Sequence, residues 1–334
     1  MLKNFIITGG SGFIGSHFID LLLLKKLNIL NIDLKNDPIE RKSKNYKFKK
    51  GNICDLKFLN KIITKKIDCV VNFAAQTHVD RSIDFPKDFI ENNVIGTFNI
   101  LEVIRKKKLN PVFVQISTDE VFGSLGLRQN SFNENSQIKP NSPYSASKAS
   151  ADHIVRSYYK TFNLKTIITH STNNFGERQH PEKLIPLSIL QLLKNKEIPV
   201  YGDGKNVRDW IYVKDNCKCI YSLIKKASYG QSYLIGSNNE ISNIKVVKKI
   251  IEIFKTVSNK SILNKGYKFV IDRKGHDFRY AIENKKLLKL NNIKFSNFDK
   301  KLLNTIKFYI KNYIPYKKKL NEKWLKKKIK NYQI

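Results

Sequence analysis

A glycine-rich turn between a short apolar strand and an amphipathic helix limits the folds open to this chain more than any other segment. Residues 2–8 are predicted to form the strand, and Gly9, Gly12 and Gly15 follow before a helical pattern over residues 16–26. Such glycines let the backbone approach a pyrophosphate closely, and the N-terminus of the next helix favours its negative charge. The spacing alone is common, but this strand–turn–helix context is the one that a dinucleotide-binding fold requires.

The position of Asp33 indicates which dinucleotide the turn would hold. This acid ends the second predicted strand, residues 28–32. A carboxylate there hydrogen-bonds the adenosine ribose hydroxyls and repels a 2′-phosphate, so the sequence favours NAD over NADP. A helix cap is the alternative interpretation of Asp33. The connection that follows is polar and rich in lysine, and a third strand is expected at residues 47–49.

Further apolar runs complete the predicted fold. Strands are expected at residues 68–73, 111–114 and 165–170, and helical segments alternate with them. This alternation predicts the α/β class, with a Rossmann-type doubly wound parallel sheet followed by a smaller C-terminal α/β substrate-binding domain. No internal repeat or low-complexity linker separates two halves, so we expect the second region to pack on the first.

The formal net charge of +34 invites a nucleic-acid interpretation. Lysine, however, is spread through every segment together with abundant asparagine and isoleucine, a pattern that drift toward AT-rich codons produces. We therefore predict no specific nucleic-acid partner, and a lysine-driven polyanion binder remains the alternative. The densest basic cluster, Tyr316 to Lys330, is predicted to form a C-terminal helix.

Location is predicted from three features of the sequence. No apolar run reaches the length of about eighteen residues that a membrane-spanning helix needs, and no basic-then-apolar leader precedes the first strand. The cysteines show neither zinc-ligand spacing nor a disulfide framework, so neither a metal nor a disulfide is predicted; they are Cys54, Cys69, Cys217 and Cys219. These features favour the cytoplasm and exclude a membrane partner.

A polar cluster after the strand at residues 111–114 is the first candidate for chemistry. Thr118, Asp119 and Glu120 stand where a buried parallel strand ends, and that edge of an α/β sheet is where ligands bind. Adjacent carboxylates whose environments differ can divide into one acid and one base. A solvated acidic loop is the alternative interpretation.

The second candidate is a Tyr-x-x-x-Lys sequence on a helix that begins after Pro143. Tyr144 and Lys148 are four residues apart, so they share one helix face. An ammonium beside a phenol is expected to lower the pKa of the phenol and give a usable base near neutral pH. The pattern is common by chance, but after a dinucleotide-binding turn it is far more specific.

These features together resemble the extended short-chain dehydrogenase/reductase family, in its NAD-dependent epimerase/dehydratase branch. Within it the chain is similar to the 4,6-dehydratases that act on dTDP-glucose, over residues 3 to about 290. The most specific blocks are residues 74–82, 117–121, 143–149, 181–186, 208–210 and 275–277. The adjacent Asp119 and Glu120 matter most, since epimerases of the family generally have small residues there.

The resemblance implies a sequence of proton and hydride transfers. Tyr144, helped by Lys148 and Thr118, would remove the proton of the sugar C4 hydroxyl while hydride passes to NAD. Glu120 would then take the C5 proton as base, and Asp119 would protonate the departing C6 hydroxyl as acid. Hydride return to C6 and reprotonation of C5 would give dTDP-4-keto-6-deoxyglucose and regenerate NAD.

The resemblance also implies which residues hold the two ligands. The NAD site would comprise Gly9, Gly12, Phe13, Ile14, Gly15, Asp33, Asn52, Ile53, Ala74, Ala75, Thr77, Tyr144 and Lys148. The nucleotide sugar would contact Ser82, Thr118, Asn173, Lys183, Leu184, Pro199, Tyr201, Arg208, Asn243, Arg273 and His276. Arg208 is the best candidate for the diphosphate, because a guanidinium offers a bidentate fork. Alternatives remain: a surface salt bridge for Arg208, a structural role for His276, and turn positions for Asn173 and Asn174.

The implied domains are an NAD-binding unit and a nucleotide-sugar-binding unit. The first would be residues 1–172, with residues 205–238 returning to it, and the second residues 173–204 and 239–334. Relatives are commonly homodimers joined through two long helices, so segments 87–107 and 144–162 are the expected interface.

Three positions depart from the family pattern. Asn52 stands where an aspartate is usual, Phe122 stands where a tyrosine is usual, and the connection after Asp33 is short. Competing hypotheses are a UDP-glucose dehydratase, a 4-epimerase, a uronate decarboxylase, and a non-catalytic protein that kept the fold.

Overall fold

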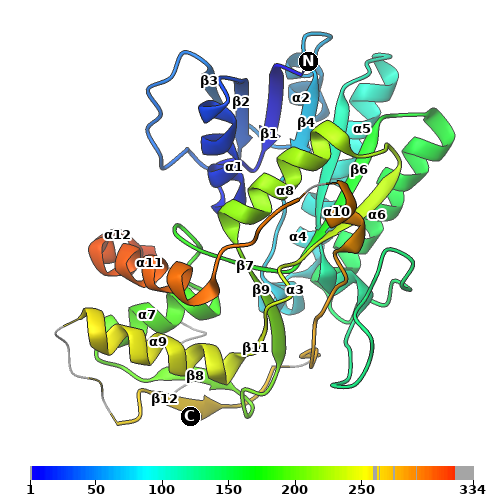
Figure 1. The fold of residues 1–334 in the computed structure, drawn as a ribbon. Coiled ribbons are helices and arrows are strands. Elements are labelled where there is room, and N and C mark those ends of the chain that lie inside the picture. Colours follow the sequence, from blue (N-terminus) through cyan, green and yellow to red (C-terminus); the bar gives the residue numbers. More distant parts are fainter. Residues whose placement is uncertain (1, 259–261, 263, 274, 291, 320–334) are drawn as a thin grey trace.

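A seven-stranded parallel sheet forms the larger part of the computed structural model, which describes residues 2–258, 262, 264–273, 275–290 and 292–319 (Figure 1). Its strand order is β10-β6-β5-β4-β1-β2-β3. The order reverses between β1 and β4, which places a ligand crevice beyond the carboxyl ends of those two strands. The predicted doubly wound fold is therefore confirmed. The strands are β1 (Asn4–Thr8), β2 (Asn28–Asp33), β3 (Tyr46–Lys50), β4 (Cys69–Asn72), β5 (Val112–Thr118), β6 (Thr166–Ser171) and β10 (Gln231–Ile235).

Helices cover both faces of this sheet, because its strands are apolar on both sides. One face packs against α1 (Phe13–Leu24) and α8 (Val213–Lys226), whose Phe18, Leu22 and Leu223 are fully buried. The opposite face packs against α2 (Leu56–Ile62), α5 (Gly96–Lys106) and α6 (Pro143–Phe162). The short α10 (Lys285–Leu290) lies beside β10.

The helix expected at residues 87–107 is not uniform. It consists of α4 (Pro86–Phe89), a π-helical segment η1 (Ile90–Ile95) and α5, with α3 (Val79–Asp84) preceding them. Within η1, Asn93 is buried, and its amide bonds the backbone of Gln76 and the hydroxyl of Ser147 on α6. The widened turn therefore brings a polar side chain into the interior, as such segments often do near functional sites.

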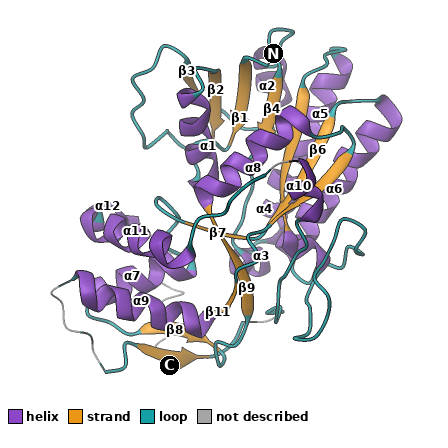
Figure 2. Cartoon of the chain, in the orientation of Figure 1, coloured by secondary structure: helices purple, strands orange, loops and turns teal. Residues whose placement is uncertain are grey.

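The remaining elements form the lower part of the molecule in Figures 1 and 2. Two small sheets have the orders β11-β9-β7 and β12-β8. Their strands are β7 (Asn173–Phe175), β8 (Ile198–Tyr201), β9 (Val207–Tyr212), β11 (Glu240–Ser242) and β12 (Tyr267–Val270). Helices α7 (Leu184–Leu193), α9 (Asn243–Val257), α11 (Phe298–Lys311) and α12 (Tyr313–Lys319) pack together beside them.

Several of the expectations from the sequence can be compared with the fold. No helix follows Asp33, so the helix-cap interpretation is wrong; a loop leads from β2 to β3 instead. Asn173 and Asn174 lie in β7, paired with β9, rather than in a turn. All four cysteines are free thiols. Within the described part of the chain, no helix is both long and apolar enough to cross a membrane. The predicted basic helix over residues 316–330 falls mostly outside the described residues.

Candidate active site

The acid pair lies at the carboxyl end of β5, at the start of the 3₁₀ turn η2 (Asp119–Phe122). Asp119 is only 1% exposed and one of its carboxylate oxygens, Oδ2, has no hydrogen-bond partner, so the solvated-loop interpretation is wrong. Burial raises the pKa of Asp119 well above its usual range, and the charges of Glu120 and Asp209 add to this rise. A buried aspartate in such a field holds a proton that it can donate.

Glu120 meets a different electrostatic environment. Burial raises the pKa of its carboxyl group as well, but the nearby charges of Arg273, Lys183 and Arg208 pull that pKa down. Three cations and one anion, Asp277, therefore act on the pKa of Glu120, whereas two anions and one cation, Arg208, act on that of Asp119. The two adjacent carboxyl groups therefore differ in their electrostatic environment.

Tyr144 and Lys148 occupy the first two turns of α6, and both are buried. Thr118 lies next to Tyr144, and hydrogen bonding between them lowers the pKa of the phenol. The net shift is nevertheless upward, because burial and the charge of Glu120 raise this pKa well above its usual range. The predicted lowering by Lys148 is therefore wrong for the protein alone: the ammonium instead donates to the Ile116 carbonyl at 2.6 Å.

The glycine turn has the geometry that a dinucleotide needs. Gly9 has a φ of +67°, and a Cβ there would lie 2.6 Å from the Ala74 nitrogen at the end of β4. A Cβ on Gly15 would lie 2.6 Å from the Gly9 carbonyl oxygen. Gly12 caps α1 without any side-chain hydrogen bond, so the first amides of α1 stay available to an anion. The chain here fits NAD, with backbone lining both sides of the crevice.

The other residues predicted for NAD lie around the same crevice. Asp33 accepts hydrogen bonds from the backbone nitrogens of Ser11 and Lys35, both at 3.1 Å. Asn52 accepts from the Cys54 nitrogen at 2.9 Å, so this unusual residue stabilises its own turn. The remaining positions sit at the start of α1 or at the carboxyl end of a neighbouring strand or turn; they are Phe13, Ile14, Ile53, Ala74, Ala75 and Thr77.

Arg208 lies on β9 and is only 3% exposed, so the surface salt-bridge interpretation is wrong. Its guanidinium donates to three backbone carbonyls, two in the 277–278 segment and one of Val207. It also lies over the Tyr280 ring, 4.2 Å from the ring centroid. These contacts fix the guanidinium plane, and a fixed plane suits bidentate binding of a phosphate.

A second group of predicted residues gathers around Asp80 on α3. The Tyr201 hydroxyl donates to Asp80 at 3.3 Å, and an Arg273 nitrogen lies 3.9 Å from the same carboxylate. The His276 ring lies 5.9 Å from the Tyr201 ring, and its Nδ1 lies 2.6 Å from Asp272. That contact is one a structural histidine would make, so the alternative for His276 stays open.

The other residues predicted for the sugar nucleotide are less closely grouped. Lys183, just before α7, donates to the Thr77 carbonyl at 3.0 Å and so links the two predicted ligand sites. Ser82 is fully buried and its hydroxyl donates to Val79 within α3. The others begin or lie within elements of the smaller sheets and helices: Asn173 in β7, Leu184 in α7, Pro199 in β8 and Asn243 in α9.

Three residues of the site were not predicted. Tyr280 supports Arg208, Asp277 accepts hydrogen bonds from Asn141 and Tyr280, and Asp80 meets Tyr201 and Arg273. The compact basic and aromatic group at residues 273–280 and the block at residues 74–82 were the available signals. Neither signal identifies a contact, because all of these partners except Asp277 and Tyr280 are far apart in the sequence.

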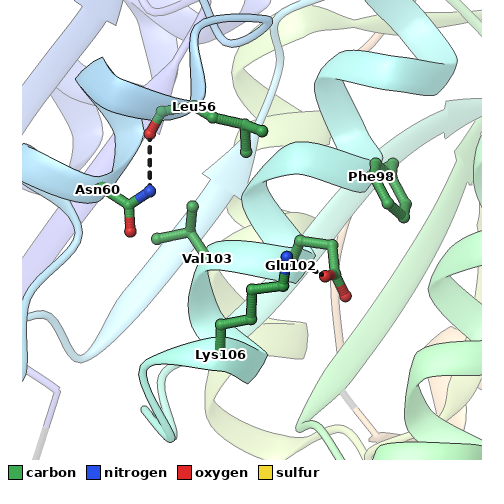
Figure 3. Close-up of a pocket in the computed structure, with 6 residues that line it drawn as sticks. All are labelled: Leu56, Asn60, Phe98, Glu102, Val103 and Lys106. Carbon is green, nitrogen blue, oxygen red and sulfur yellow. Dashed lines mark hydrogen bonds and ion pairs between the residues drawn. The ribbon is translucent and has the colours of Figure 1, made fainter.

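One hollow lies away from this site. It has a volume of about 110 Å³ and is formed between α2 and α5 by Leu56, Asn60, Phe98, Glu102, Val103 and Lys106 (Figure 3). Its single carboxylate, Glu102, is bonded to Arg105 and to the Tyr158 hydroxyl. The only acid that lines the hollow is therefore already paired.

Comparison of the sequence with known proteins gives a consistent family. The GDP-mannose 4,6 dehydratase family profile matches residues 6–294. A dTDP-glucose 4,6-dehydratase of Haemophilus influenzae is 40% identical over 93% of this chain and 99% of its own length. One of Neisseria meningitidis serogroup B is 37% identical over 93% of this chain and 94% of its own length.

Solved structures agree with this result. DesIV, a dTDP-glucose 4,6-dehydratase of Streptomyces venezuelae solved with NAD and dTDP bound, has a TM-score of 0.89 and 33% identity. The two structures share 95% of this chain and 100% of that one. The enzyme of Bacillus anthracis, solved in complex with NAD, has a TM-score of 0.84 and 40% identity, covering 95% and 99% of the two chains. The chain belongs to the dTDP-glucose 4,6-dehydratase family, within the extended short-chain dehydrogenases/reductases.

Proposed function

We propose that this protein is an NAD-dependent lyase that converts dTDP-glucose to dTDP-4-keto-6-deoxyglucose. The observation that carries the proposal is the acid pair at the end of β5. Asp119 lies in a field that favours the protonated form, Glu120 lies among three cations, and Tyr144 is beside both. Loss of water across C5 and C6 needs one acid and one base on adjacent carbons, and this pair supplies them.

The chain would hold NAD in the crevice between β1 and β4. Gly9, Gly12 and Gly15 make room for the pyrophosphate, and Asp33 lies at the end of β2 where the adenosine ribose is bound in this fold. NAD, when bound, supplies the hydride acceptor for the sugar C4 and the hydride donor for C6. The side chains of the protein would transfer the protons and exclude water from the site.

Tyr144 would take the proton of the C4 hydroxyl. Its phenol is buried next to Thr118, and hydrogen bonding to that residue opposes the rise in the pKa of the phenol that burial and Glu120 cause. Lys148 is held by the Ile116 carbonyl one helical turn further on. A ketone at C4 makes the C5 proton acidic. Removal of that proton is the next step, and a second residue would carry it out.

Glu120 would remove the C5 proton, and Asp119 would protonate the leaving C6 hydroxyl. The two residues are adjacent in sequence and share the η2 turn, so they can act on neighbouring carbons of one sugar ring. The cations that lower the pKa of Glu120 also make this part of the site suitable for a diphosphate. Arg208, Arg273 and Lys183 would bind that group and the sugar beside it.

The test uses the purified full chain without added NAD. It is incubated separately with dTDP-glucose and UDP-glucose, and the 4-keto-6-deoxy product is followed by its absorbance after alkali. We expect turnover of dTDP-glucose, together with NAD released when the protein is denatured. Faster turnover of UDP-glucose would support the proposed mechanism but would identify UDP-glucose as the substrate. No product from either sugar, with NAD added, would refute the proposal.

We also propose a cytoplasmic homodimer with the two predicted domains. Free thiols at all four cysteines support a reducing compartment. The dimer proposal is supported by exposed apolar side chains on the segment from η1 to α5 and at the end of α6; they are Ile90, Ile95, Phe98 and Phe162. Figure 1 shows α5 and α6 side by side on one face of the sheet. The seven-stranded sheet would form the NAD-binding unit, and the elements with β8, β12 and α9 the sugar-binding unit.

The dimer is tested by charge substitution. Phe98→Glu should convert the protein from a dimer to a monomer in sedimentation, because it places a carboxylate in the apolar interface. Leu24→Glu is the matched control, since Leu24 is an exposed apolar residue at the end of α1 on the other face of the sheet. A wild-type monomer would contradict the proposal.

A further inference from the structure

The loop at residues 34–45, which leads from β2 to β3, is fastened to α1 by one arginine (Figure 1). The side chain of Arg41 is only 5% exposed, although it lies in this loop. Its Nε donates to Asp20 at 3.0 Å, and one terminal nitrogen donates to Asp37 at 2.5 Å. The other terminal nitrogen donates to the Ser16 carbonyl, also on α1, at 3.1 Å. All three guanidinium nitrogens therefore have a partner, and two of the partners are carboxylates.

The anchor for Arg41 on α1 is fixed in turn. The other carboxylate oxygen of Asp20 accepts a hydrogen bond from Arg178, in the segment after β7, at 2.6 Å. The same Arg178 nitrogen lies 2.6 Å from Nδ1 of His17, one turn earlier on α1. The helix that holds these contacts begins at the glycine-rich turn. The loop is therefore tied to the helix whose N-terminus would face the pyrophosphate of NAD.

A second chain of hydrogen bonds leads from the loop back to the glycine-rich turn. The Tyr46 hydroxyl, at the start of β3, donates to Asp37, and the Arg41 guanidinium lies 5.2 Å from the centroid of the Tyr46 ring. Asn31 on β2 is fully buried, and its amide donates to the Tyr46 hydroxyl at 2.9 Å and to the Ser11 hydroxyl at 3.2 Å. Ser11 belongs to the glycine-rich turn, so the loop and the turn are parts of one polar cluster.

This cluster surrounds the acid that is expected to bind the adenosine ribose. The backbone nitrogen of Ser11 donates to Asp33 at 3.1 Å, and so does that of Lys35, at the beginning of the loop. Asp33 is therefore held from one side by the glycine-rich turn and from the other by the loop. A loop that opened would release one of these contacts and change the direction of the carboxylate.

The choice of an arginine at position 41 is informative. Lysine makes up most of the 62 basic residues of the chain, so composition alone favours lysine here. An ammonium is a point charge, whereas a guanidinium presents its donors in a rigid plane and can serve Asp20, Asp37 and a carbonyl together. Asp37 is as well buried as Arg41, and a buried ion pair adds little net stability but can fix one conformation. The cluster therefore suits a loop that has to keep a single conformation.

We propose that Arg41 is a positioning residue of the NAD site, which holds the loop at residues 34–45 closed on α1 and so keeps Asp33 in place for the adenosine ribose before NAD binds. The inference rests on the proposed NAD site. It adds a residue that acts on the cofactor only through the loop and Asp33. Because the site is formed in advance, NAD loses little binding free energy to ordering the loop, and it is released slowly.

The expected effect follows from the number of contacts. A hydrogen bond between charged groups changes an equilibrium by at least about ten-fold. Arg41→Lys keeps the charge but loses at least one such bond. A loop without regular secondary structure opens at a low free-energy cost, so this loss should appear directly in the fraction of molecules with a closed loop. The affinity for NAD falls in proportion to that fraction, mainly through faster release.

The experiment uses the purified full chain with the NAD that it carries. It measures the moles of NAD per mole of protein and the rate at which bound NAD exchanges for labelled NAD. Arg41→Lys and Asp37→Asn should both lower the NAD content and speed the exchange about ten-fold or more. Arg279→Lys is the matched control, because Arg279 also contacts one carboxylate at two points, on Glu240 at 2.6 and 3.0 Å. This control should lower the melting temperature but leave the exchange of NAD unchanged.

Two results would overturn the inference. One is a wild-type exchange rate in folded Arg41→Lys and Asp37→Asn proteins, and if only one of these variants folds, that variant decides. The other is an equal acceleration in Arg279→Lys, because the effect would then come from general loosening of the protein. Neither readout depends on the sugar. A wild type that holds NAD but does not convert dTDP-glucose would therefore count against the proposed function alone.

Discussion

Replacing Glu120 with glutamine isolates the proposed base. The amide keeps the size of the side chain and still fits among Arg208, Arg273 and Lys183, but it cannot accept the C5 proton. In the structure those three cations oppose the rise that burial causes in the pKa of Glu120. A positioned general base contributes about 10²–10⁴-fold, which corresponds to about 3–5 kcal/mol of barrier.

The assay separates the steps. With dTDP-glucose in deuterated water, Glu120→Gln should still oxidise C4, seen as absorbance of the reduced cofactor, but should incorporate no deuterium at C5. Asp119→Asn should give the reverse pattern, with exchange at C5 and little loss of the C6 hydroxyl. Glu252→Gln, on the exposed side of α9, serves as the matched control and should behave as the wild type. Normal C5 exchange in Glu120→Gln would refute the assignment of the base.

Three further predictions follow from single contacts. Gly9→Ala should lower the NAD content of the purified protein, because alanine at a φ of +67° costs about 1–2 kcal/mol and its Cβ would lie 2.6 Å from the Ala74 nitrogen. Gly126→Ala is the control, since a Cβ there would have no neighbouring atom nearer than 3.6 Å. Burial, with the Arg178 charge, lowers the pKa of His17 from 6.5 to about 4. Because the unfolded chain binds this proton first, stability measured by thermal melts should fall by up to about 3 kcal/mol as pH drops from 6.5 toward 4, and His17→Gln should flatten that fall. Arg208→Lys should reduce stability by about 1.5–3 kcal/mol and weaken dTDP-glucose binding, since an ammonium cannot serve three carbonyls and stack on a ring.

The sequence predicted most of the larger sheet because its signals are local. A glycine turn after β1, an acid after β2 and apolar runs at the other strands are each visible within a few residues. The π-helical segment η1 was not predictable, because it depends on Asn93 finding partners on α6 and near Gln76. The loop after Asp33 was recognised as short, but not the contacts that fasten it: Arg41 bonds Asp20 on α1 and also Asp37.

The candidate site was predictable as a set of residues but not as an electrostatic arrangement. Sequence patterns identified Tyr144 and Lys148 and predicted that the lysine lowers the pKa of the phenol. In the structure, burial and Glu120 dominate, and the ammonium is held at the Ile116 carbonyl. Burial depends on the whole fold, so no local pattern reports it.

Asp119 and Glu120 show that two residues adjacent in sequence can have very different electrostatic environments. The charge of Asp209 raises the pKa of Asp119, whereas the charges of Arg273, Lys183 and Arg208 lower the pKa of Glu120; Arg208 also lowers the pKa of Asp119. Those cations are between about 60 and 150 residues away along the chain. The sugar-binding elements therefore do more than hold the substrate. By supplying Arg208, Lys183 and Arg273, they also oppose the rise in the pKa of Glu120 that burial causes. If Glu120 is the base, a change that displaces these elements should lower kcat as well as raise KM.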